Sequence, residues 1–369
     1  MLNTLTENAI KFMVLGITIY SVFLGMGLVG YIFYRPRKGD EKASNVEIVI
    51  VSKANEKVKN SLIEVVKYHV KLFNKVTLVV DEDAPLIDML INMKGVRLVV
   101  VPNKYRRDLV GKGRALNYFV EHYVKPDKWY VFIDDDNIIM DLNFLYEIPL
   151  YEKQGFVAAN GILVPRQGRS KITFTMDWVR YIDDITLYRF FTGLLGKPLI
   201  GLHGELMIVK GSVLKEVKFD KKTIAEDFVF AIELVKRGYK TWQSATRVSI
   251  KSPNSIRDLM FQRGRWFKGV VSGIKYCPTP MKILIIFRSV TWVLSFIVII
   301  LLYPVLSYLG FALFLLPTNI YYIGSYTYGI YKSKTPQLFL LLPFFGLLEA
   351  SSRLYGLIEV NDFVVIDKN

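Results

Sequence analysis

Long apolar runs lie near both ends of the chain, and the middle of the chain mixes polar and apolar residues. The run near the amino end is Phe12–Tyr34, and three more follow toward the carboxyl end, at Ile283–Leu306, Leu309–Ile330 and Leu338–Ile358. About 20 apolar residues are enough to cross a bilayer as a helix. The pattern therefore predicts four membrane spans, one before the middle region and three after it.

Basic residues beside these runs predict the side of the membrane on which the middle region lies. Arg35, Arg37 and Lys38 directly follow the first run, and Lys332 and Lys334 lie between the last two. Short loops that are rich in Lys and Arg stay in the cytoplasm. We therefore expect an integral membrane protein, in the plasma membrane, whose middle region is cytoplasmic. A cleaved signal peptide is disfavoured, because its basic residues would precede the apolar run.

The first part of the middle region alternates between strand and helix patterns. The expected strands are Val46–Val51, Val76–Val80, Arg97–Val101 and Trp129–Ile133, and the expected helices are Glu56–Phe73 and Gly111–Tyr123. This alternation predicts an α/β fold with a mostly parallel sheet. Ligands of such sheets bind beyond the carboxyl ends of the strands. Asp81 and the triplet Asp134–Asp136 stand at two of these strand ends.

The remaining elements complete one cytoplasmic domain and lead back to the membrane. We expect a helix over Lys171–Leu195, a strand over Gly201–Val213, a helix that begins after Thr223 and a strand near Thr246–Ile250. The stretch Ser255–Lys275 is basic and amphipathic, which is typical of a helix that lies on a bilayer surface. The predicted organisation is an anchor at 1–36, a catalytic domain at 37–253, an interfacial helix region at 254–280 and membrane helices at 281–369.

Composition narrows the classes of partner. Hydrophobic residues make up 52% of the chain and the net charge is +15. A basic membrane protein suits anionic lipid and phosphorylated substrates. We expect no nucleic-acid partner, because no recognised nucleic-acid module is present. The single Cys277 cannot form an internal disulfide.

Carboxylates at the strand ends are candidates for metal and nucleotide binding. Asp134 and Asp136 point the same way if the strand geometry continues, and two such carboxylates can share a hard divalent cation that bridges two phosphates. Asp81 can hydrogen-bond a base or a ribose. The alternative is that both segments are solvated acidic turns. Lys112 opens a helix after a glycine, which suits a phosphate but is a weak signal by itself.

The segment 223–269 carries the most distinctive chemistry. Glu226 and Asp227 open a helix, and a helix N-terminus favours negative charge, so we expect Asp227 to stay ionised at neutral pH and to accept a proton. About 35 residues later, the chain places Gln262, Arg263, Arg265 and Trp266 within five positions. They offer guanidiniums for a diphosphate and an indole for a sugar. The simpler alternatives are a helix-dipole contact and a membrane-docked helix surface.

Three further charged residues fall within the predicted spans. Arg288 lies in the second span, and Glu349 and Arg353 lie in the last. Ionisable residues inside a bilayer are usually paired or face a polar cavity. We favour a structural ion pair over a path for a polar lipid head. No role is assigned to His203.

Taken in order, these motifs resemble the membrane-integrated family 2 glycosyltransferases of the cellulose-synthase-like type. The shared positions are Ser52–Glu56, Asp81, Lys112 with Ala115–Asn117, Asp134 with Asp136, Glu226–Asp227 and Gln262-Arg263-x-Arg265-Trp266. Within that superfamily the chain is most similar to the Egghead-like β-1,4-mannosyltransferases, through Lys197–Leu199, Ala225–Asp227, Phe230–Ala231, Lys251–Pro253 and Gly269. It departs from them in having Ala225 in place of the usual Thr.

The resemblance implies a GT-A-type nucleotide-sugar-binding domain and an inverting transfer of mannose from GDP-mannose to a lipid-linked, polyprenyl-type saccharide. Asp227 would be the general base, and Asp134 and Asp136 would hold Mg²⁺ or Mn²⁺. The donor would be bound by Asp81, Lys112, Asp134, Arg263 and Arg265. The acceptor would be bound by Trp266, Glu226 and Gln262.

Other activities stay open at this point. One is a processive polysaccharide synthase that uses a UDP-sugar, although four spans leave little material for a polymer channel. A second is transfer to a polyprenyl phosphate, which needs no general base. A third is a membrane scaffold or transporter with an inactive transferase domain, against which the intact acidic and cationic motifs speak.

Overall fold

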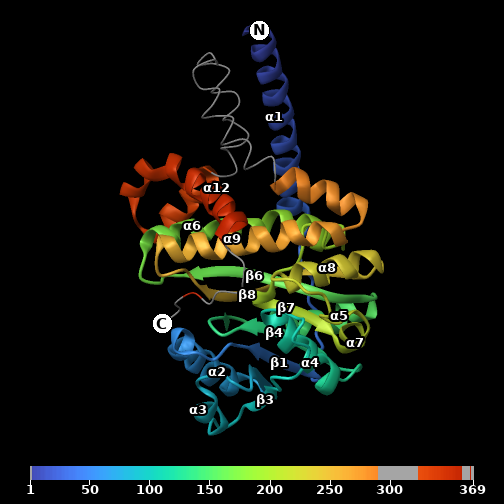
Figure 1. Ribbon diagram of the computed structural model, residues 1–369. Coiled ribbons are helices and arrows are strands. Elements are labelled where there is room, and N and C mark those ends of the chain that lie inside the picture. Colours follow the sequence, from blue (N-terminus) through green and yellow to red (C-terminus); the bar gives the residue numbers. More distant parts are fainter. Residues whose placement is uncertain (1, 290–322, 360–365, 367–369) are drawn as a thin grey trace.

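The computed structural model describes residues 2–289, 323–359 and 366, and its centre is one eight-stranded sheet (Figure 1). The strand order is β3-β2-β1-β4-β7-β6-β8-β5. The strands are β1 (Val46–Val51), β2 (Val76–Asp81), β3 (Arg97–Val101), β4 (Trp129–Asp134), β5 (Ile138–Ile139), β6 (Phe156–Arg166), β7 (Met207–Lys210) and β8 (Lys240–Lys251). The α/β class is thereby confirmed.

The sheet is mixed, and so the expectation of a mostly parallel sheet holds for only part of it. Strands β3, β2, β1 and β4 run parallel to one another. Strand β7 then pairs antiparallel with both β4 and β6, and β8 returns parallel to β6. The four predicted strands of the first part are all present. The antiparallel insertion of β7 was not predicted, because strand direction depends on partners that are distant in sequence.

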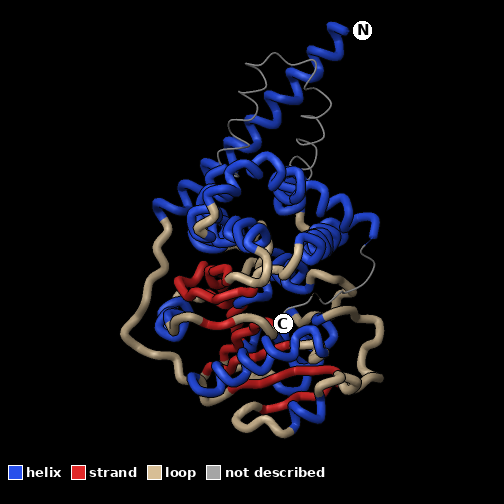
Figure 2. Tube along the Cα trace, turned by 90° about the vertical axis from the view of Figure 1, so that its left-hand side faces the viewer, coloured by secondary structure: helices blue, strands red, loops and turns tan. Residues whose placement is uncertain are grey.

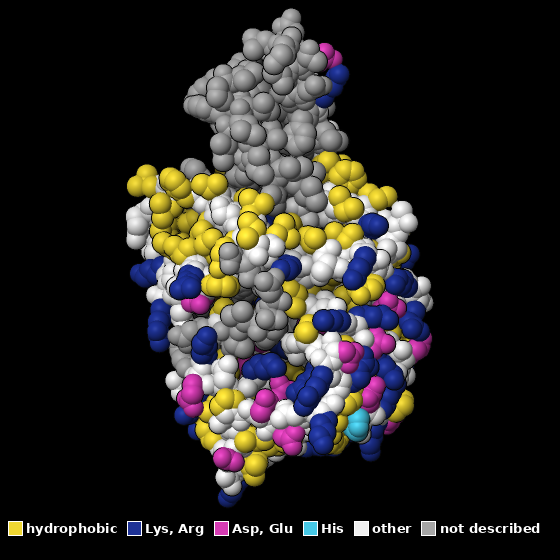
Figure 3. Space-filling view, viewed as in Figure 1, with side chains coloured by type: hydrophobic (Ala, Val, Ile, Leu, Met, Phe, Trp, Pro, Cys, Tyr) yellow, Lys and Arg dark blue, Asp and Glu magenta, His cyan; other side chains and the backbone are white. Residues whose placement is uncertain are grey.

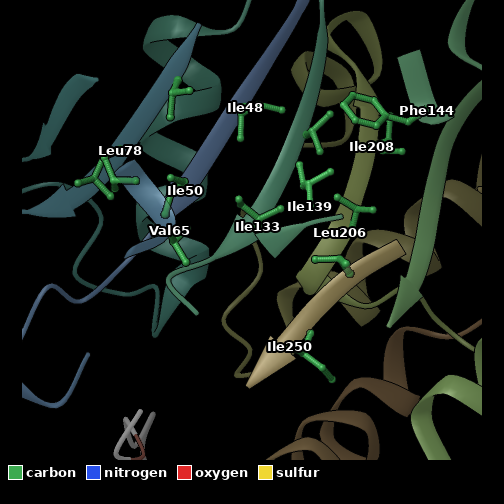
Figure 4. Close-up of a cluster of buried hydrophobic side chains, with 14 of the residues drawn as sticks. Ile48, Ile50, Val65, Leu78, Ile133, Ile139, Phe144, Leu206, Ile208 and Ile250 are labelled. Atoms are coloured by element: carbon green, nitrogen blue, oxygen red, sulfur yellow. The ribbon is translucent and has the colours of Figure 1, made fainter. Parts of the chain in front are cut away.

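Helices cover both faces of the sheet. They are α2 (Lys59–Leu72), α3 (Ile87–Ile91), α4 (Lys112–Tyr123), α5 (Asn143–Lys153), α7 (Gly211–Val217) and α8 (Glu226–Lys236). Alternate residues of a strand point to opposite faces, and β4 follows this rule. Val131 and Ile133 join the core beneath α2 and α5, whereas Tyr130 and Phe132 join the core beneath α4, α7 and α8. Figure 4 shows the first of these cores, with Val65 and Phe144 against the strands.

A further layer of long helices crosses one end of the sheet (Figures 1 and 2). It contains α6 (Lys171–Asp183), the π-helical η2 (Asp184–Leu194), α9 (Ile256–Gly273), and α12 (Leu342–Glu359) after the 3₁₀ segment η5 (Pro336–Leu341). Residues 279–289 and 323–333 are also helical. The first helix, α1 (Leu2–Phe33), packs on η2 and then rises away from the sheet.

The predicted membrane spans stay predictions. Over the residues whose structure is described, no helix is both long and apolar enough to cross a membrane. Much of the expected spans Ile283–Leu306 and Leu309–Ile330 lies outside those residues. The expected span Leu338–Ile358 is divided between η5 and α12. Figure 3 shows hydrophobic side chains gathered around this helical layer, whereas charged side chains cover the body below it.

Two other sequence predictions differ in detail from the structure. The expected helix Lys171–Leu195 is α6 followed directly by η2. The expected strand Gly201–Val213 is an extended loop, a short 3₁₀ turn η3 (Gly204–Leu206), β7 and the start of α7. The loop is consequential, because it brings the backbone of Gly204 to the cavity described next.

Candidate active site

A cavity of about 370 Å³ lies between the carboxyl ends of the strands and the helical layer. Its walls come from the ends of β1, β2 and β4, the loop before β7, the start of α8, and the helices α6, α9 and α12. All the side chains that the sequence singled out for the site line it, namely Asp81, Lys112, Asp134, Asp136, Glu226, Asp227, Gln262, Arg263, Arg265 and Trp266. The fold thus brings together motifs that are far apart in sequence.

One end of the cavity is formed where β2 stops. The Asp81 carboxylate accepts hydrogen bonds from Lys53 Nζ and Arg114 Nη2, each at 2.6 Å. Burial raises the pKa of Asp81, but these two cations outweigh the effect and hold it below its ordinary value. Asp81 is therefore a fixed anion at the edge of the cavity, suited to hydrogen-bonding a hydroxyl or an amine of a ligand.

The acidic triplet follows β4 and crowds three carboxyl groups together. Asp134 is paired with Lys112 Nζ, and Asp135 accepts a hydrogen bond from Ser52 Oγ at 2.5 Å. Burial and the neighbouring carboxylates raise the pKa of Asp135 to about 7. Asp136 is buried, with 5% of its surface exposed. A cluster of this kind is short of positive charge, and a cation would lower its energy.

The triplet fits a hard divalent cation, although the site contains few protein ligands. In the described part of the chain, no group of three or more His, Cys, Asp or Glu side chains is arranged to hold a metal. Mg²⁺ is usually held by one or two carboxylates, with substrate phosphates and water as the other ligands. Asp134 and Asp136 supply two carboxylates, which is within this range, so the residues present fit such an ion.

Asp227 lies in the first turn of α8 and faces the loop before β7. Its carboxylate accepts hydrogen bonds from Gly204 N at 2.9 Å and from Phe228 N at 2.7 Å. Burial, followed by repulsion from Glu226 and Glu205, raises the pKa of Asp227 to about 7. The helix terminus alone was expected to keep Asp227 ionised at neutral pH. Because burial is the larger effect, this carboxyl instead changes protonation near neutrality, which suits a general base.

The α9 cluster is more heavily paired than its sequence suggested. Arg263 Nη2 donates to Asp177 at 2.7 Å, and Arg263 Nε lies 3.4 Å from a carboxylate oxygen of Glu349. The guanidiniums of Arg180 and Arg263 lie 4.5 and 4.9 Å from the centre of the Trp266 ring. Gln262 is buried, and its side-chain oxygen has no hydrogen-bond partner among the described residues. Arg263 therefore acts within a buried ion-pair network as well as lining the cavity.

Two of the charged residues in the predicted spans form ion pairs beside the cavity. Glu349 of α12 reaches Arg263, and Arg288 Nη2 donates to Asp183 at 3.2 Å. Both Glu349 and Arg353 line the cavity. Glu349 and Arg288 are paired as expected, but their partners Arg263 of α9 and Asp183 of α6 lie outside the predicted spans.

Several functional residues were not found from the sequence. His203 Nε2 lies 3.1 Å from Asp184, Glu205 pairs with Arg180, and the Tyr188 ring lies 5.3 Å from the His203 ring. His203 is one of three histidines in the sequence, and it lies between Gly201 and Gly204. That composition is a usable but weak signal. Arg180 and Asp184 carry none, because they look like ordinary charged positions of a long helix.

Comparison with known proteins identifies the family. Residues 129–345, more than half of the chain, match the family described as "Glycosyl transferase family group 2". The chain therefore belongs to this family of glycosyltransferases.

Curated relatives are β-1,4-mannosyltransferases. The chain is 28% identical to the β-1,4-mannosyltransferase bre-3 of Caenorhabditis briggsae, over 74% of this chain and 67% of that protein. It is also 28% identical to the β-1,4-mannosyltransferase egh of Drosophila melanogaster, over 64% of this chain and 56% of that protein. Part of each relative thus has no counterpart in the alignment.

A solved structure shares the fold. The mannosyltransferase PcManGT of Pyrobaculum calidifontis, determined with GDP-Man and Mn²⁺, matches with a TM-score of 0.57 and 15% identity, over 93% of this chain and 99% of that one. The likeness shows that the α/β domain with its mixed sheet has the glycosyltransferase GT-A-like fold that the sequence resemblance implied.

Proposed function

We propose that the protein transfers mannose from GDP-mannose to a lipid-linked saccharide, with inversion at the anomeric carbon and formation of a β-linkage. The observation that carries the proposal is the position of Asp227, which faces the same cavity as the acidic triplet and has a pKa near 7. The β-1,4-mannosyltransferase relatives and the GDP-Man-bound structural neighbour support the choice of sugar and donor.

At the donor end of the cavity, Asp81 would hold the nucleoside, and Lys112, Arg263 and Arg265 would offset the charge of the diphosphate. Asp134 and Asp136 would hold a Mg²⁺ or Mn²⁺ ion, which when bound would supply positive charge to the diphosphate leaving group. The carboxylates of Asp177 and Glu349 offset the charge of Arg263, so it contributes less positive potential to the cavity than the sequence suggests. Lys112 is paired in the same way with Asp134, so a bound diphosphate would share each of these cations with a carboxylate of the protein.

At the acceptor end, Trp266, Glu226 and Gln262 would bind the acceptor sugar. Ionised Asp227 would remove the proton from the acceptor hydroxyl, whose oxygen attacks the anomeric carbon as the bond to the diphosphate oxygen breaks. Attack from the face opposite the leaving group inverts the configuration, so an α-linked donor gives a β-linked product. Backbone N–H groups of Gly204 and Phe228 orient the Asp227 carboxylate for this proton transfer.

We also propose that the protein resides in the plasma membrane, with its catalytic domain in the cytoplasm. The apolar runs, the basic residues beside them and the hydrophobic side chains around the helical layer support this placement. The domain limits stay as proposed above, at 37–253 for the catalytic domain, followed by 254–280 and 281–369.

The proposal is tested with the purified full chain, Mn²⁺, labelled GDP-mannose and a polyprenyl-linked disaccharide. We expect a single mannose to be added and Asp227→Asn to lower kcat by about 10²- to 10⁴-fold, because a general base contributes that much. Glu216→Gln changes an exposed carboxylate on α7 and should retain full activity. Selective thermal stabilisation by UDP-glucose or UDP-GlcNAc instead of GDP-mannose would overturn the donor, and a long polymeric product would favour a processive synthase.

Metal dependence is tested separately at the triplet. Chelation should abolish transfer, and Mn²⁺ should restore it. Asp136→Asn removes one of the two assigned carboxylates, so the Mn²⁺ concentration for half-maximal activity should rise by about 10-fold or more. Full activity of the wild type in excess chelator would exclude the metal assignment, whatever the sugar proves to be.

A further inference from the structure

We infer that Asn160 is a positioning residue for the general base, acting through the loop that carries the backbone of Gly204. The inference rests on the proposed role of Asp227. Asn160 lies on β6, is fully buried, and does not line the cavity. Its side chain instead holds the loop His203–Leu206, whose Gly204 N–H donates to Asp227.

The contact between Asn160 and the loop uses both ends of the amide. Asn160 Nδ2 donates to the carbonyl oxygens of His203 at 2.9 Å and of Leu206 at 3.1 Å. Asn160 Oδ1 accepts from His203 N at 3.0 Å. These three bonds satisfy the amide in a place where water has no access, and they replace the sheet partners that this extended loop lacks. No other side chain of similar size supplies two donors and an acceptor in this arrangement.

A second buried amide holds the far end of the same loop. Asn137 Nδ2, just beyond the acidic triplet, donates to the carbonyl oxygen of Glu205 at 2.9 Å. The loop is therefore fixed on both sides of Gly204. With its neighbours fixed, the Gly204 N–H is directed at Asp227 Oδ2 and not at solvent.

The position of this N–H affects how readily Asp227 ionises. Among the described residues, the side chains with the largest electrostatic effect on Asp227 are Glu226, Glu205 and Lys112, from α8, η3 and α4, and Tyr188 of η2 also interacts with it. Two of these are acids that oppose its ionisation, and burial opposes it further. A backbone N–H that donates to the carboxylate acts in the other direction. Loosening the loop should therefore make the base harder to ionise.

The sheet provides a matched control at the position that pairs with Asn160. Asn160 on β6 is the register partner of Gln243 on β8. Gln243 is also fully buried, and its side-chain nitrogen donates to the carbonyl oxygen of Gly161 at 2.8 Å. The Gln243 side chain does not bond to the loop. Truncating either residue removes a buried amide from the same part of the sheet, but only Asn160→Ala releases Gly204.

The experiment compares Asn160→Ala, Asn160→Ser, Gln243→Ala and the wild type, using kcat for glycosyl transfer between pH 5.5 and 9.5 at saturating donor. Losing a hydrogen bond to a charged group shifts a pKa by about one unit. The acid limb of Asn160→Ala should move up by about that amount. Its kcat should then be about fivefold below wild type at pH 7 and close to wild type at pH 9.

Three results separate a positioning role from a structural one. At high pH, the kcat of Asn160→Ala must return close to the wild-type value. The kcat of Asp227→Asn must stay low at every pH, because this variant has no carboxyl to ionise. Gln243→Ala should keep the wild-type pH profile, and the KM for the donor should be unchanged in all four proteins. Asn160→Ser, which keeps one hydroxyl donor, should shift the acid limb in the same direction by a smaller amount, and it carries the test if Asn160→Ala does not fold.

An acid limb at the wild-type pH in both Asn160 variants would overturn the inference, as would equal shifts in Asn160→Ala and Gln243→Ala. Failure of the proposed function has a different signature, because wild-type protein would then show no transfer of mannose at any pH. If another nucleotide sugar proves to be the donor, the same comparison is made with that sugar.

Discussion

Two carboxyl groups of the cavity, those of Asp135 and Asp227, have pKa values raised to about 7, with burial as the largest cause in each. Asp81 is buried as well, yet two cations keep its pKa low. The number of positive partners thus separates an anion that stays charged from a carboxyl that can take up and release a proton. At the residue scale, the site contains both kinds within one cavity.

The raised pKa of Asp227 predicts that the ionised form, which is needed for catalysis, makes the folded protein less stable. An acid whose pKa is about 7 when folded and about 4 when unfolded binds its proton more tightly in the folded state. Stability therefore falls as the pH rises from about 4 to about 7. Asp227→Asn should raise the melting temperature by a few degrees at pH 8 and by much less at pH 5. Equal melting temperatures of the two proteins at pH 8 would contradict a buried ionised carboxylate.

The sequence was sufficient for most of the residues of the site but for few of their partners. Asp81 and the triplet were predicted because an apolar strand that ends in acids exposes them at the edge of a sheet. The loop around Gly204 was expected to be a strand, because its apolar pattern continues into β7. The side chains of Asn160 and Asn137 bind its backbone in place of a neighbouring strand. Contacts between distant segments of this kind leave no local pattern.

Helices α9 and α12 cross closely in the helical layer, and glycines at the crossing permit it. A Cβ atom on Gly264 would lie 2.7 Å from Gly356 Cα, and one on Gly356 would lie 2.2 Å from Gly264 O. Cβ atoms do not approach a backbone so closely. At the element scale, this crossing sets how far Glu349 of α12 reaches toward Arg263 of α9.

Adding one methyl group at this crossing should separate the two helices. We expect Gly356→Ala to destabilise the protein by about 1–3 kcal/mol, since overpacking a contact without room has that cost. Gly324→Ala is the matched control, because a Cβ at Gly324 would meet no atom of the described residues within 4 Å, and in a helix it should be neutral or stabilising by up to about 1 kcal/mol. Thermal unfolding in the same detergent compares the two variants, and equal melting temperatures would argue against the close crossing.

At the scale of the whole molecule, the first helix is joined to the sheet by one buried side chain. Tyr34, just beyond α1, donates its hydroxyl to the carbonyl oxygen of Gln243 at 2.8 Å and accepts from Gln243 N at 3.1 Å. Gln243 lies on β8, near the far edge of the sheet. The Tyr34 ring also lies against Gly193 of η2, so the amino-terminal helix, η2 and β8 meet around this side chain.

Removing the hydroxyl of Tyr34 tests this connection. Tyr34→Phe keeps the ring but leaves the buried N–H and carbonyl of Gln243 without that partner, so we expect a loss of about 1–3 kcal/mol in the free energy of unfolding. Tyr146→Phe is a suitable comparison, because its ring is more exposed. Similar denaturation midpoints for wild type and Tyr34→Phe would show that the helix and the sheet are held together in another way.

The pairing of Glu349 with Arg263 has a practical consequence for anyone who wishes to prepare the catalytic part alone. Glu349 and Arg353 of α12 line the cavity. Both lie beyond residue 345, the last residue of the family match. A fragment that stops at residue 280 would retain Asp177 and Arg263 but lose the second carboxylate and one wall of the cavity. The smallest fragment with a complete pocket should therefore include α12 and extend to Ile366, which also lines the cavity.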